Sequence, residues 1–464
     1  MINLGMLKTE ISFKLNGEQK LIKNLPTTAT VLDYLRNTEN KATKKGCGDG
    51  DCGACTISIL VSEDGKTKYK AVNSCLLPIA AIDGKEIFTA EGIESKNGLH
   101  PVQESLLEHS ASQCGYCTPG ITMSMFSAFY SGKLDDSSLE GNLCRCTGYV
   151  PIRVAAQALD KPAKSDRFAK KLKKEVKSKA FDLELNKHLY YLPATVEQAV
   201  EYLKDKDAII IAGATDLGLE LSHKSKDYPV LVSVENIAEL KEIKNDKDSL
   251  TIGAGINLSY LEENLKTEFK PLEKMLKVFA ARQIRNRATI GGNIGTASPI
   301  GDLLPVFLAL DAKVNLAGPK GRRSIDIADY FVGYRQTKKE KDELIVSVTL
   351  NKQSNKNKYL SSSYKVSKRA SDDISIVSAA YFVELDNNKI VTARLAYGGV
   401  AATPVRAKKA EKYLIGKTWN KETIEETKAI LLKEFKPLDD VRASAKYRNK
   451  LVANLFEKFF VEES

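Results

Sequence analysis

The first part of the chain alternates apolar and polar residues over short runs, which is the pattern of half-buried β-strands. Residues 9–15, TEISFKL, alternate in this way. The pair Asn16-Gly17 that follows is typical of a tight turn into a second strand. Residues 56–62 and 68–75 predict a further hairpin.

A short helix is expected between the two hairpins, over residues 30–36, capped by Thr30 or by nearby Thr28. The order of elements is that of a small, strand-rich, ferredoxin-like domain. From about residue 98 to residue 160 the apolar residues recur at three- or four-residue steps instead, in PVQESLLEHSA, TPGITMSMFSAFYSG, SSLEGNLC and VPIRVAAQALD. Four short helices in succession predict a helical bundle.

The second half of the chain predicts two mixed domains. Strand-like runs such as AIIIAG (208–213) and PVLVSV (229–234) alternate with helical stretches, as in α/β folds. In the last hundred residues the strands YKVSKR, ISIVSAAYFVEL and IVTARLAYGG precede helices at 421–435 and 445–462. This order predicts an α+β domain at the end of the chain.

At 464 residues the chain is too long for one core, and roughly 150 residues per domain indicates about three domains. The first residues lack the apolar region of a signal peptide, and no apolar run approaches the ~20 residues that span a bilayer. We therefore expect a cytoplasmic protein without a membrane segment. Thiols stay reduced there, so clustered cysteines more often bind metal than form disulfides.

The net charge of +11 is concentrated in one segment. Residues 161–180, KPAKSDRFAKKLKKEVKSKA, hold nine Lys or Arg residues and two acidic residues. This composition predicts an exposed linker or a weak docking strip. The segment has no interleaved aromatic residues, so we expect no nucleic-acid partner.

Four of the eight cysteines fit the ligand spacing of a plant-type [2Fe–2S] cluster: Cys47, Cys52, Cys55 and Cys75. The first three lie in KGCGDGDCGAC, whose glycines accept the dihedral angles that a loop around two irons requires. A bare backbone also lets N–H groups approach the sulfurs. The alternatives are a zinc knuckle or cysteines without metal, but zinc sites usually pair two Cys-x-x-Cys hooks.

The other four cysteines form two close pairs, Cys114 with Cys117 and Cys144 with Cys146, where predicted helices meet. Pro119 suits the first turn of a helix, whose dipole would then favour thiolates at Cys117. A tetrahedral zinc site is the alternative here. A ferredoxin-type cluster just upstream needs an electron partner, which favours a second [2Fe–2S] cluster.

Two glycine-rich loops follow buried apolar runs in the second half: IIIAGATDLG (209–218) and QIRNRATIGGNIGTASPIGD (283–302). Neither matches G-x-G-x-x-G, so a Rossmann site is not supported. Backbone N–H groups in such loops can cradle a pyrophosphate, although a turn without ligand is an alternative. Behind two iron–sulfur sites, a flavin is the cofactor that accepts electrons singly and passes them on as hydride.

Together these motifs resemble the small subunit of the bacterial xanthine dehydrogenases, within the molybdenum hydroxylase family. The resemblance rests on the cysteine loop, QCGYCTPG, NLCRCTGY, GATDLG and QIRNRATIGGNIGTASPIGDLLP, in this order. Family members of the carbon monoxide dehydrogenase type carry the iron–sulfur and flavin parts on separate chains. Their fusion here, without a molybdenum domain, favours the xanthine dehydrogenase arrangement.

The resemblance implies an α+β multidomain fold. It consists of a β-grasp [2Fe–2S] ferredoxin domain, a four-helix [2Fe–2S] bundle, a basic linker, an α/β FAD-binding domain of the PCMH/VAO-like type and an α+β C-terminal domain. The expected bounds are, in the same order, 8–90, 91–162, 163–184, 185–355 and 356–464.

The resemblance also implies a relay of electrons. Purines would be oxidised to urate at a molybdenum–pterin cofactor on a large subunit, in a heterotetramer of two small and two large subunits. Electrons would pass through the helical-domain cluster, then the ferredoxin cluster and FAD, and finally to NAD⁺. Gln113 matches the family residue that touches the pterin, although an ordinary surface glutamine is the alternative.

The family's FAD contacts fall on two stretches and a few single positions of this sequence. Phe279 has a plain core residue as its alternative and Lys365 a solvated strand residue. The contacts are Ile210, Ile211, Ala212, Gly213, Ala214, Thr215, Asp216, Leu217, Phe279, Thr289, Ile290, Gly291, Gly292, Asn293, Thr296, Asp302, Ile345 and Lys365.

Asp372-Asp373 matches a family loop that affects nicotinamide access, with a surface turn as the alternative. Two positions depart from the family pattern: Ala214 stands where Asn is frequent, and Gly295 replaces a larger apolar residue. Both leave the affinity for FAD open.

No catalytic triad is evident, and we assign no catalytic role to the four scattered histidines. The hypotheses are therefore an electron-transfer subunit serving xanthine, the same kind of subunit serving an aldehyde or N-heterocycle, or a zinc-bound scaffold without redox activity.

Overall fold

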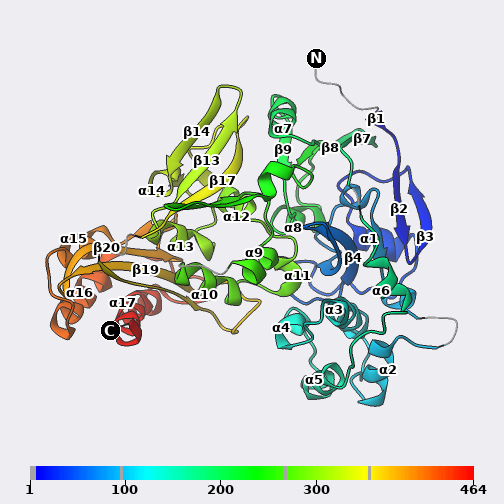
Figure 1. Ribbon diagram of the computed structural model, residues 1–464, viewed down its shortest axis with the longest axis horizontal. Coiled ribbons are helices and arrows are strands. Elements are labelled where there is room, and N and C mark those ends of the chain that lie inside the picture. The colour runs from blue at the N-terminus through cyan, green and yellow to red at the C-terminus, as the bar shows by residue number, and fades with distance from the viewer. Residues whose placement is uncertain (1–6, 95–97, 177, 266–268, 354–356, 464) are drawn as a thin grey trace. The chain divides into compact units, whose positions relative to one another are not determined.

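The computed structural model describes residues 7–94, 98–176, 178–265, 269–353 and 357–463 (Figure 1). By internal packing the chain divides into two units. The first contains the residues up to Ile237 together with Ala280–Ala288, and the second contains Ala238–Phe279 and the residues from Thr289 onward. None of the helices in the described part of the chain is long and apolar enough to cross a membrane.

The first unit begins with a mixed five-stranded sheet of order β3-β2-β6-β4-β5. The two predicted hairpins are confirmed, and Asn16 and Gly17 both take the positive φ angles that their turn requires. Thr30, rather than Thr28, caps the predicted helix by accepting from the Asp33 backbone N–H. The elements are β2 (Ile11–Leu15), β3 (Glu18–Ile22), α1 (Val31–Asn37), β4 (Thr56–Glu63), β5 (Lys66–Asn73), a 3₁₀ turn (Ile79–Ile82) and β6 (Glu86–Phe88).

Four short helices follow, as predicted, and Figure 1 shows them in cyan to teal around α3. Pro119 lies in the first turn of α3, and Cys117 is the N-terminal cap residue of that helix. Apolar side chains such as Val102, Met125 and Ile152 form the core of this helical domain. The helices are α2 (Pro101–Glu108), α3 (Thr118–Ser131), α4 (Asp136–Leu139) and α5 (Val150–Gln157).

The basic segment differs from the predicted exposed linker, because part of it folds as helix α6 (Arg167–Lys171). Phe168 is buried in an aromatic cluster with Tyr69, Phe88 and Phe126, so one side chain contacts both the ferredoxin sheet and the helical domain. The many charged residues around Phe168 predicted an exposed segment, so the burial of this one ring was not expected. One residue of the predicted linker, Lys177, lies outside the described residues.

The rest of the first unit is a second five-stranded sheet, of order β1-β7-β8-β10-β9, with parallel pairing of β10 to both β8 and β9. Its side chains Leu183, Tyr190 and Leu231 share one hydrophobic core with Ile11 and Phe13 of the ferredoxin sheet. The elements are β1 (Leu7–Lys8), β7 (Phe181–Leu185), β8 (His188–Leu192), α7 (Val196–Tyr202), β9 (Ala208–Ile211), α8 (Leu217–Ser222), β10 (Val230–Ser233) and, from the later segment, α11 (Arg282–Arg285).

The second unit contains an antiparallel sheet of order β11-β12-β17-β13-β14. Its elements are a 3₁₀ turn (Ala238–Lys241), β11 (Ile243–Asn245), β12 (Ser249–Gly253), α9 (Leu258–Asn264), α10 (Lys270–Val278), α12 (Ile290–Thr296), α13 (Leu303–Ala309), β13 (Lys313–Gly318), β14 (Gly321–Asp326), α14 (Ile327–Tyr330), β15 (Phe331–Gly333), β16 (Gln336–Thr337) and β17 (Leu344–Asn351).

The predicted α+β tail is confirmed as a sheet of order β18-β19-β20-β21 followed by helices. Tyr381, Phe456 and Phe459 are fully buried where α17 packs on β19, so aromatic stacking joins helix to sheet. The elements are β18 (Lys358–Val366), β19 (Val377–Asp386), β20 (Lys389–Gly398), β21 (Val405–Arg406), α15 (Lys408–Leu414), α16 (Lys421–Glu434) and α17 (Ala445–Glu463).

Candidate cofactor-binding sites

The first cysteine loop, residues 45–55, joins α1 to β4 and turns tightly on itself. Gly53 adopts a φ of +65°, and a Cβ atom there would lie 2.0 Å from the carbonyl oxygen of Gly141. No side chain fits such a close approach of two backbones, so glycine is required at this position. The loop therefore lies directly against the segment that leads into Cys144.

Within this loop the sulfurs of Cys47 and Cys52 form a close pair. The backbone N–H of Cys47 donates to Cys52 Sγ at 3.3 Å, and that of Asp49 donates to Cys47 Sγ at 3.3 Å. A hydrogen bond from the Cys52 thiol, reinforced by backbone donors, lowers the pKa of Cys47 to about 5. Donors arranged in this way stabilise the anionic sulfur that a metal ligand must present.

Cys55 and Cys75 form the second close pair, with their sulfurs 3.3 Å apart. Both thiols are buried, and Leu32 and Leu76 pack against them. A hydrogen bond between the two thiols lowers the pKa of Cys55 and raises the pKa of Cys75. Water is thus excluded from one half of this cysteine set.

The helical domain places its cysteines differently. The sulfurs of Cys114 and Cys146 lie 3.3 Å apart, and both residues are exposed. Cys117 and Cys144 face each other further inside, where burial and the hydrogen bond to Cys144 raise the pKa of Cys117 to about 12. Burial opposes ionisation of Cys144, but hydrogen bonds from Thr147 outweigh burial and lower its pKa.

The eight thiols are thus arranged as four pairs. They come from four segments: the 45–55 loop, Cys75 after β5, Cys114 and Cys117 before α3, and Cys144 and Cys146 between α4 and α5. In the described part of the chain, no group of three or more His, Cys, Asp or Glu side chains gathers closely enough to hold a single ion. A structural zinc site needs four ligands around one ion, whereas a [2Fe–2S] cluster needs two thiolates on each of two irons. Four sulfur pairs match the two thiolates on each of two irons that a [2Fe–2S] cluster requires.

The first predicted FAD stretch, Ile210–Leu217, lies in the first unit, from the end of β9 to the start of α8. Ala214 adopts a φ of +64°, a left-handed conformation that costs a non-glycine residue about 1–2 kcal/mol. Gly213 packs so closely on the Arg287 carbonyl that a Cβ would lie 1.8 Å from it. This strained turn is held in place by the Arg287 side chain, which donates to the Gly213 carbonyl oxygen at 3.3 Å.

The second predicted stretch, Thr289–Asn293, opens α12 in the second unit. The Thr289 side chain caps the helix by accepting from the Gly292 N–H at 3.0 Å. Asn293 Oδ1 is buried and has no hydrogen-bond partner among the described residues. A buried polar atom without a partner is costly unless something else supplies a donor, so this loop fits a polar ligand.

Asp302 and Lys365 form a buried ion pair in the second unit, with Lys365 Nζ 2.8 Å from Asp302 Oδ2. The Lys365 side chain is only 3% exposed, so the alternative of a solvated strand residue is wrong. Ser375 also donates to Asp302. A Cβ at Gly295 would lie 3.6 Å from Ile345 Cδ1, so glycine leaves open the space that a larger side chain would fill.

The remaining predicted positions differ in their surroundings. Phe279 caps the C-terminus of α10 and is half-buried, as is Thr296 in α12. Asp373 accepts hydrogen bonds from the backbone N–H groups of Arg369 and Ile374. Asp372 is buried, so the alternative of a plain surface turn does not describe this pair. Gln113 is exposed beside Cys114.

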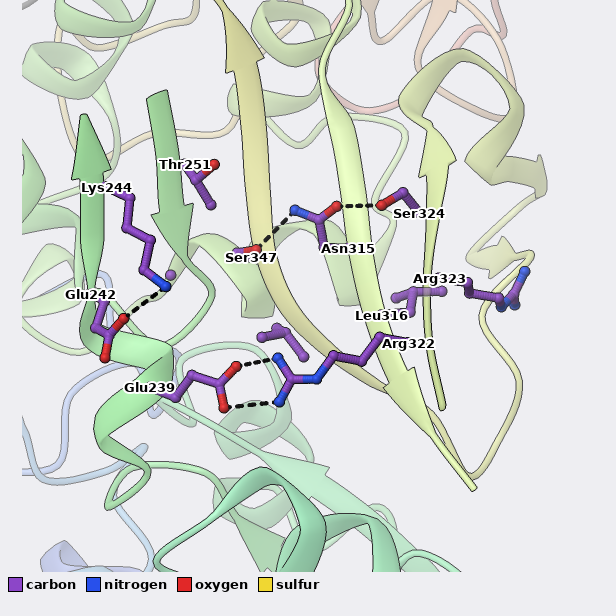
Figure 2. Close-up of a pocket in the computed structure, with 12 residues that line it drawn as sticks. Glu239, Glu242, Lys244, Thr251, Asn315, Leu316, Arg322, Arg323, Ser324 and Ser347 are labelled. Carbon is purple, nitrogen blue, oxygen red and sulfur yellow. Dashed lines mark hydrogen bonds and ion pairs between the residues drawn. The ribbon is translucent and has the colours of Figure 1, made fainter. Parts of the chain in front are cut away.

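A polar pocket of about 320 Å³ lies on the face of the β12-β17-β13-β14 sheet (Figure 2). Asn315 donates to Ser347 Oγ at 2.9 Å and accepts from Ser324 at 2.6 Å, and Glu239 forms a two-bond ion pair with Arg322. None of the predicted site residues lines this pocket. We therefore do not assign it to a cofactor.

The structure also gathers polar residues that the sequence did not indicate. Gln283, Asn142 and Ser124 form a buried hydrogen-bonded group in the first unit, and fully buried Arg285 pairs with Glu140 at 2.5 Å. In the sequence, the one indication of these residues was the stretch QIRN (283–286), which places polar residues directly after an apolar run. These residues come from three distant segments, which local patterns do not connect.

Four protein families match successive parts of the chain. Residues 13–80 match "2Fe-2S iron-sulfur cluster binding domain" and residues 89–157 match "[2Fe-2S] binding domain". Residues 180–352 match "FAD binding domain in molybdopterin dehydrogenase", and residues 362–463 match "CO dehydrogenase flavoprotein C-terminal domain".

Among whole proteins, the chain is 33% identical to xanthine dehydrogenase of Emericella nidulans and 33% identical to xanthine dehydrogenase 1 of Arabidopsis thaliana. These matches cover 97% and 98% of this chain but only 38% and 40% of the relatives, so the chain spans about two fifths of their length. A solved structure of carbon monoxide dehydrogenase from Hydrogenophaga pseudoflava aligns with a TM-score of 0.55 and 26% identity, over 58% of this chain and 94% of that one. Quinoline 2-oxidoreductase from Pseudomonas putida 86 aligns with a TM-score of 0.55 and 25% identity, over 59% and 95%.

The domain content and fold are those of the [2Fe–2S] and FAD-binding chain of a molybdenum hydroxylase. More narrowly, the chain belongs to the xanthine dehydrogenase and carbon monoxide dehydrogenase family of oxidoreductases, and its curated homologues named above are xanthine dehydrogenases. The resemblance seen in the sequence is confirmed at this level.

Proposed function

We propose that this chain is the electron-transfer subunit of a xanthine dehydrogenase. It would carry electrons from a molybdenum–pterin cofactor on a large partner subunit to NAD⁺ while hypoxanthine and xanthine are oxidised to urate. Support comes from the xanthine dehydrogenase homologues and from the three cofactor-binding domain families that the chain matches. The proposal includes a cytoplasmic heterotetramer of two small and two large subunits.

The observation that carries the proposal is the arrangement of the eight thiols in four pairs, two in the ferredoxin domain and two in the helical domain. We assign Cys47, Cys52, Cys55 and Cys75 to one [2Fe–2S] cluster and Cys114, Cys117, Cys144 and Cys146 to the other. Each cluster supplies one-electron transfer when bound, and FAD converts such electrons into a hydride. The chain's own contribution is to donate backbone hydrogen bonds to the sulfurs of Cys47 and Cys52 and to keep water away from Cys55 and Cys75.

For FAD, the chain offers the strained turn at Ala214, the buried amide of Asn293 and the buried Asp302–Lys365 pair. We propose that the bound cofactor donates the hydrogen bond that Asn293 Oδ1 lacks. We also propose that the Asp302–Lys365 ion pair holds a charged group next to the cofactor. We further propose that the Asp372-Asp373 turn governs access of the nicotinamide. Each of these roles is that of binding or orienting, not of bond making.

The solved structures support a second substrate class, N-heterocycles or aldehydes, as the alternative. About 58–59% of the chain aligns with a quinoline 2-oxidoreductase and a carbon monoxide dehydrogenase, at 25% and 26% identity. Substrate choice lies on the molybdenum-binding partner, so an N-heterocycle or an aldehyde in place of xanthine would leave this chain unchanged. The zinc-bound scaffold is disfavoured by the paired thiols.

The test is to purify the chain anaerobically with its partner and record the visible spectrum. We expect broad iron–sulfur absorption with a flavin shoulder, bleached by xanthine and restored by NAD⁺. A colourless preparation would contradict the electron-transfer function. Bleaching by aldehydes or quinoline but not by xanthine would retain the relay and overturn the substrate.

A further inference from the structure

The segment Ala280–Ala288, which we call the hook, packs with the first unit although the chain on both sides of it belongs to the second unit. The hook contains α11, and it directly precedes the predicted FAD stretch that begins at Thr289. It is therefore a part of the flavin-binding sequence that is built into the iron–sulfur unit.

The hook contacts both iron–sulfur domains. Asn286 Nδ2 donates to the carbonyl oxygen of Ala71 on β5 of the ferredoxin sheet at 2.9 Å. Arg285, fully buried, pairs with Glu140 of the helical domain at 2.5 Å. Loss of one partner of a buried ion pair strongly destabilises the fold, because the other charge is left without a partner. The Arg285–Glu140 pair therefore holds the hook in one position.

At the centre of the hook, Gln283 is only 1% exposed and donates two hydrogen bonds from its Nε2 atom. One reaches Asn142 Oδ1 at 2.9 Å and the other reaches Ser124 Oγ, on α3, at 3.0 Å. The Ser124 hydroxyl in turn donates to Asn142 Oδ1 at 2.6 Å. Gln283 thus fixes the orientation of the Asn142 amide.

Asn142 joins the 45–55 loop to the segment that contains Cys144 and Cys146. Its Nδ2 atom donates to the carbonyl oxygen of Gly53 at 3.0 Å, between the predicted ligands Cys52 and Cys55. The next residue, Leu143, donates its backbone N–H to the Cys52 carbonyl oxygen at 3.0 Å. Asn142 itself lies two residues before Cys144, so any rotation of its amide moves both loops.

Gln283 is more than a space-filling residue. Its Oε1 atom is buried without a hydrogen-bond partner among the described residues, which costs about 1–3 kcal/mol. Methionine or leucine would fill a similar volume without that cost. The two bonds made by Nε2 are the property that an apolar side chain lacks.

We propose that Gln283 is a positioning residue for the electron relay. Through Asn142 it sets the spacing between the 45–55 loop and the segment that contains Cys144 and Cys146. The flavin-binding part of the chain thereby fixes the distance and orientation between the two clusters. This inference rests on the proposed function, because it has meaning only if both loops hold clusters. It assigns to Gln283 no contact with a cofactor.

The test compares Gln283→Met, which keeps length and volume but removes the donor, with Gln353→Met in the second unit. The Gln353 amide donates to the backbone carbonyl oxygen of nearby Asn351 at 3.3 Å. Both are made in the full chain purified with its partner. Three quantities are measured: iron and sulfide content, the magnetic interaction between the two reduced clusters by low-temperature EPR, and the rate of flavin reduction after mixing with xanthine.

For Gln283→Met we expect full iron content, an altered splitting of the cluster signals, and flavin reduction slowed roughly tenfold, since a 1 Å displacement of reacting groups can cost ~100-fold. Gln353→Met should match the wild-type protein in all three. Unchanged splitting and rate in Gln283→Met would overturn the inference, as would equal changes in both variants. If the wild-type protein itself lacks iron and sulfide, the proposed function fails instead, and the two failures are therefore distinguishable.

Discussion

The two cysteine sets differ most in how far they are exposed to water. In the ferredoxin domain, Cys55 and Cys75 are buried and pack against Leu32 and Leu76, whereas Cys114 and Cys146 of the helical domain are exposed. Burial disfavours added negative charge, so a buried cluster and an exposed one take up electrons unequally. One chain thus builds, from cysteines alone, one site that is shielded from water and one that is exposed to it.

The largest effect is expected when one thiol is removed from each loop. Cys75→Ser and Cys114→Ser should each lose about half of the bound iron and sulfide, since each breaks one cluster. Cys75→Ser should in addition lower the midpoint of thermal unfolding strongly, because it places a hydroxyl in a buried apolar site, while Cys114→Ser should not. Metal analysis and circular dichroism melting check both. Equal destabilisation by the two variants would contradict the difference in burial.

A smaller effect separates the glycines of the two loops. Gly53 and Gly115 both have positive φ angles, but a Cβ at Gly53 would clash with a backbone oxygen, whereas a Cβ at Gly115 would meet nothing within 4 Å. We expect Gly53→Ala to lose about 2–6 kcal/mol of unfolding free energy and Gly115→Ala only about 1–2 kcal/mol. Urea denaturation measures both. A Gly53→Ala protein as stable as Gly115→Ala would contradict the close backbone approach of Gly53 to Gly141.

Acid should loosen the packing of the helical domain around His100, whose ring contacts Phe126, Phe129 and Tyr130 of α3 and Phe168 of α6. Burial lowers the pKa of His100 from its usual 6.5 to about 4, so the unfolded chain binds more protons than the folded chain between these values. The stability that neutral His100 contributes is present above pH ~6.5 and is lost as the pH falls toward ~4, by at most about 3 kcal/mol.

The variant His100→Asn keeps a side-chain oxygen for capping α2 but cannot take up a proton. Its unfolding free energy should therefore change less between pH 6.5 and pH 4.5 than that of the wild-type protein. Chemical denaturation at several pH values checks this slope. Parallel curves for the two proteins would be inconsistent with a buried, neutral His100.

The smallest effect concerns the turn before α8, which keeps an alanine at a left-handed position where the cysteine loops use glycine. Ala214→Gly relieves this conformation and should raise the unfolding free energy by up to about 1 kcal/mol. Ala212→Gly, at a position without a positive φ, should lower it by roughly 0.5–1 kcal/mol. Urea denaturation compares them, and a loss of stability in both variants would exclude strain at Ala214.

The sequence predicted what short-range chemistry determines. Asn16-Gly17, Thr30 and Pro119 specify a turn, a cap and a helix start by themselves, and the spacing of the cysteines indicated two ligand sets. The burial of Phe168, the pairing of β1 with β7 and the Gln283–Asn142 hydrogen bond were not predictable in this way. Each depends on a partner far along the chain, which no local pattern specifies.

The most direct test of the account is the time course of iron release to an excess of a strong iron chelator under anaerobic conditions. Two [2Fe–2S] clusters of unequal exposure predict about four irons per chain, released in two equal phases, with the fast phase absent in Cys114→Ser. Release in a single phase, or recovery of zinc in place of iron, would contradict two clusters that differ in their access to water.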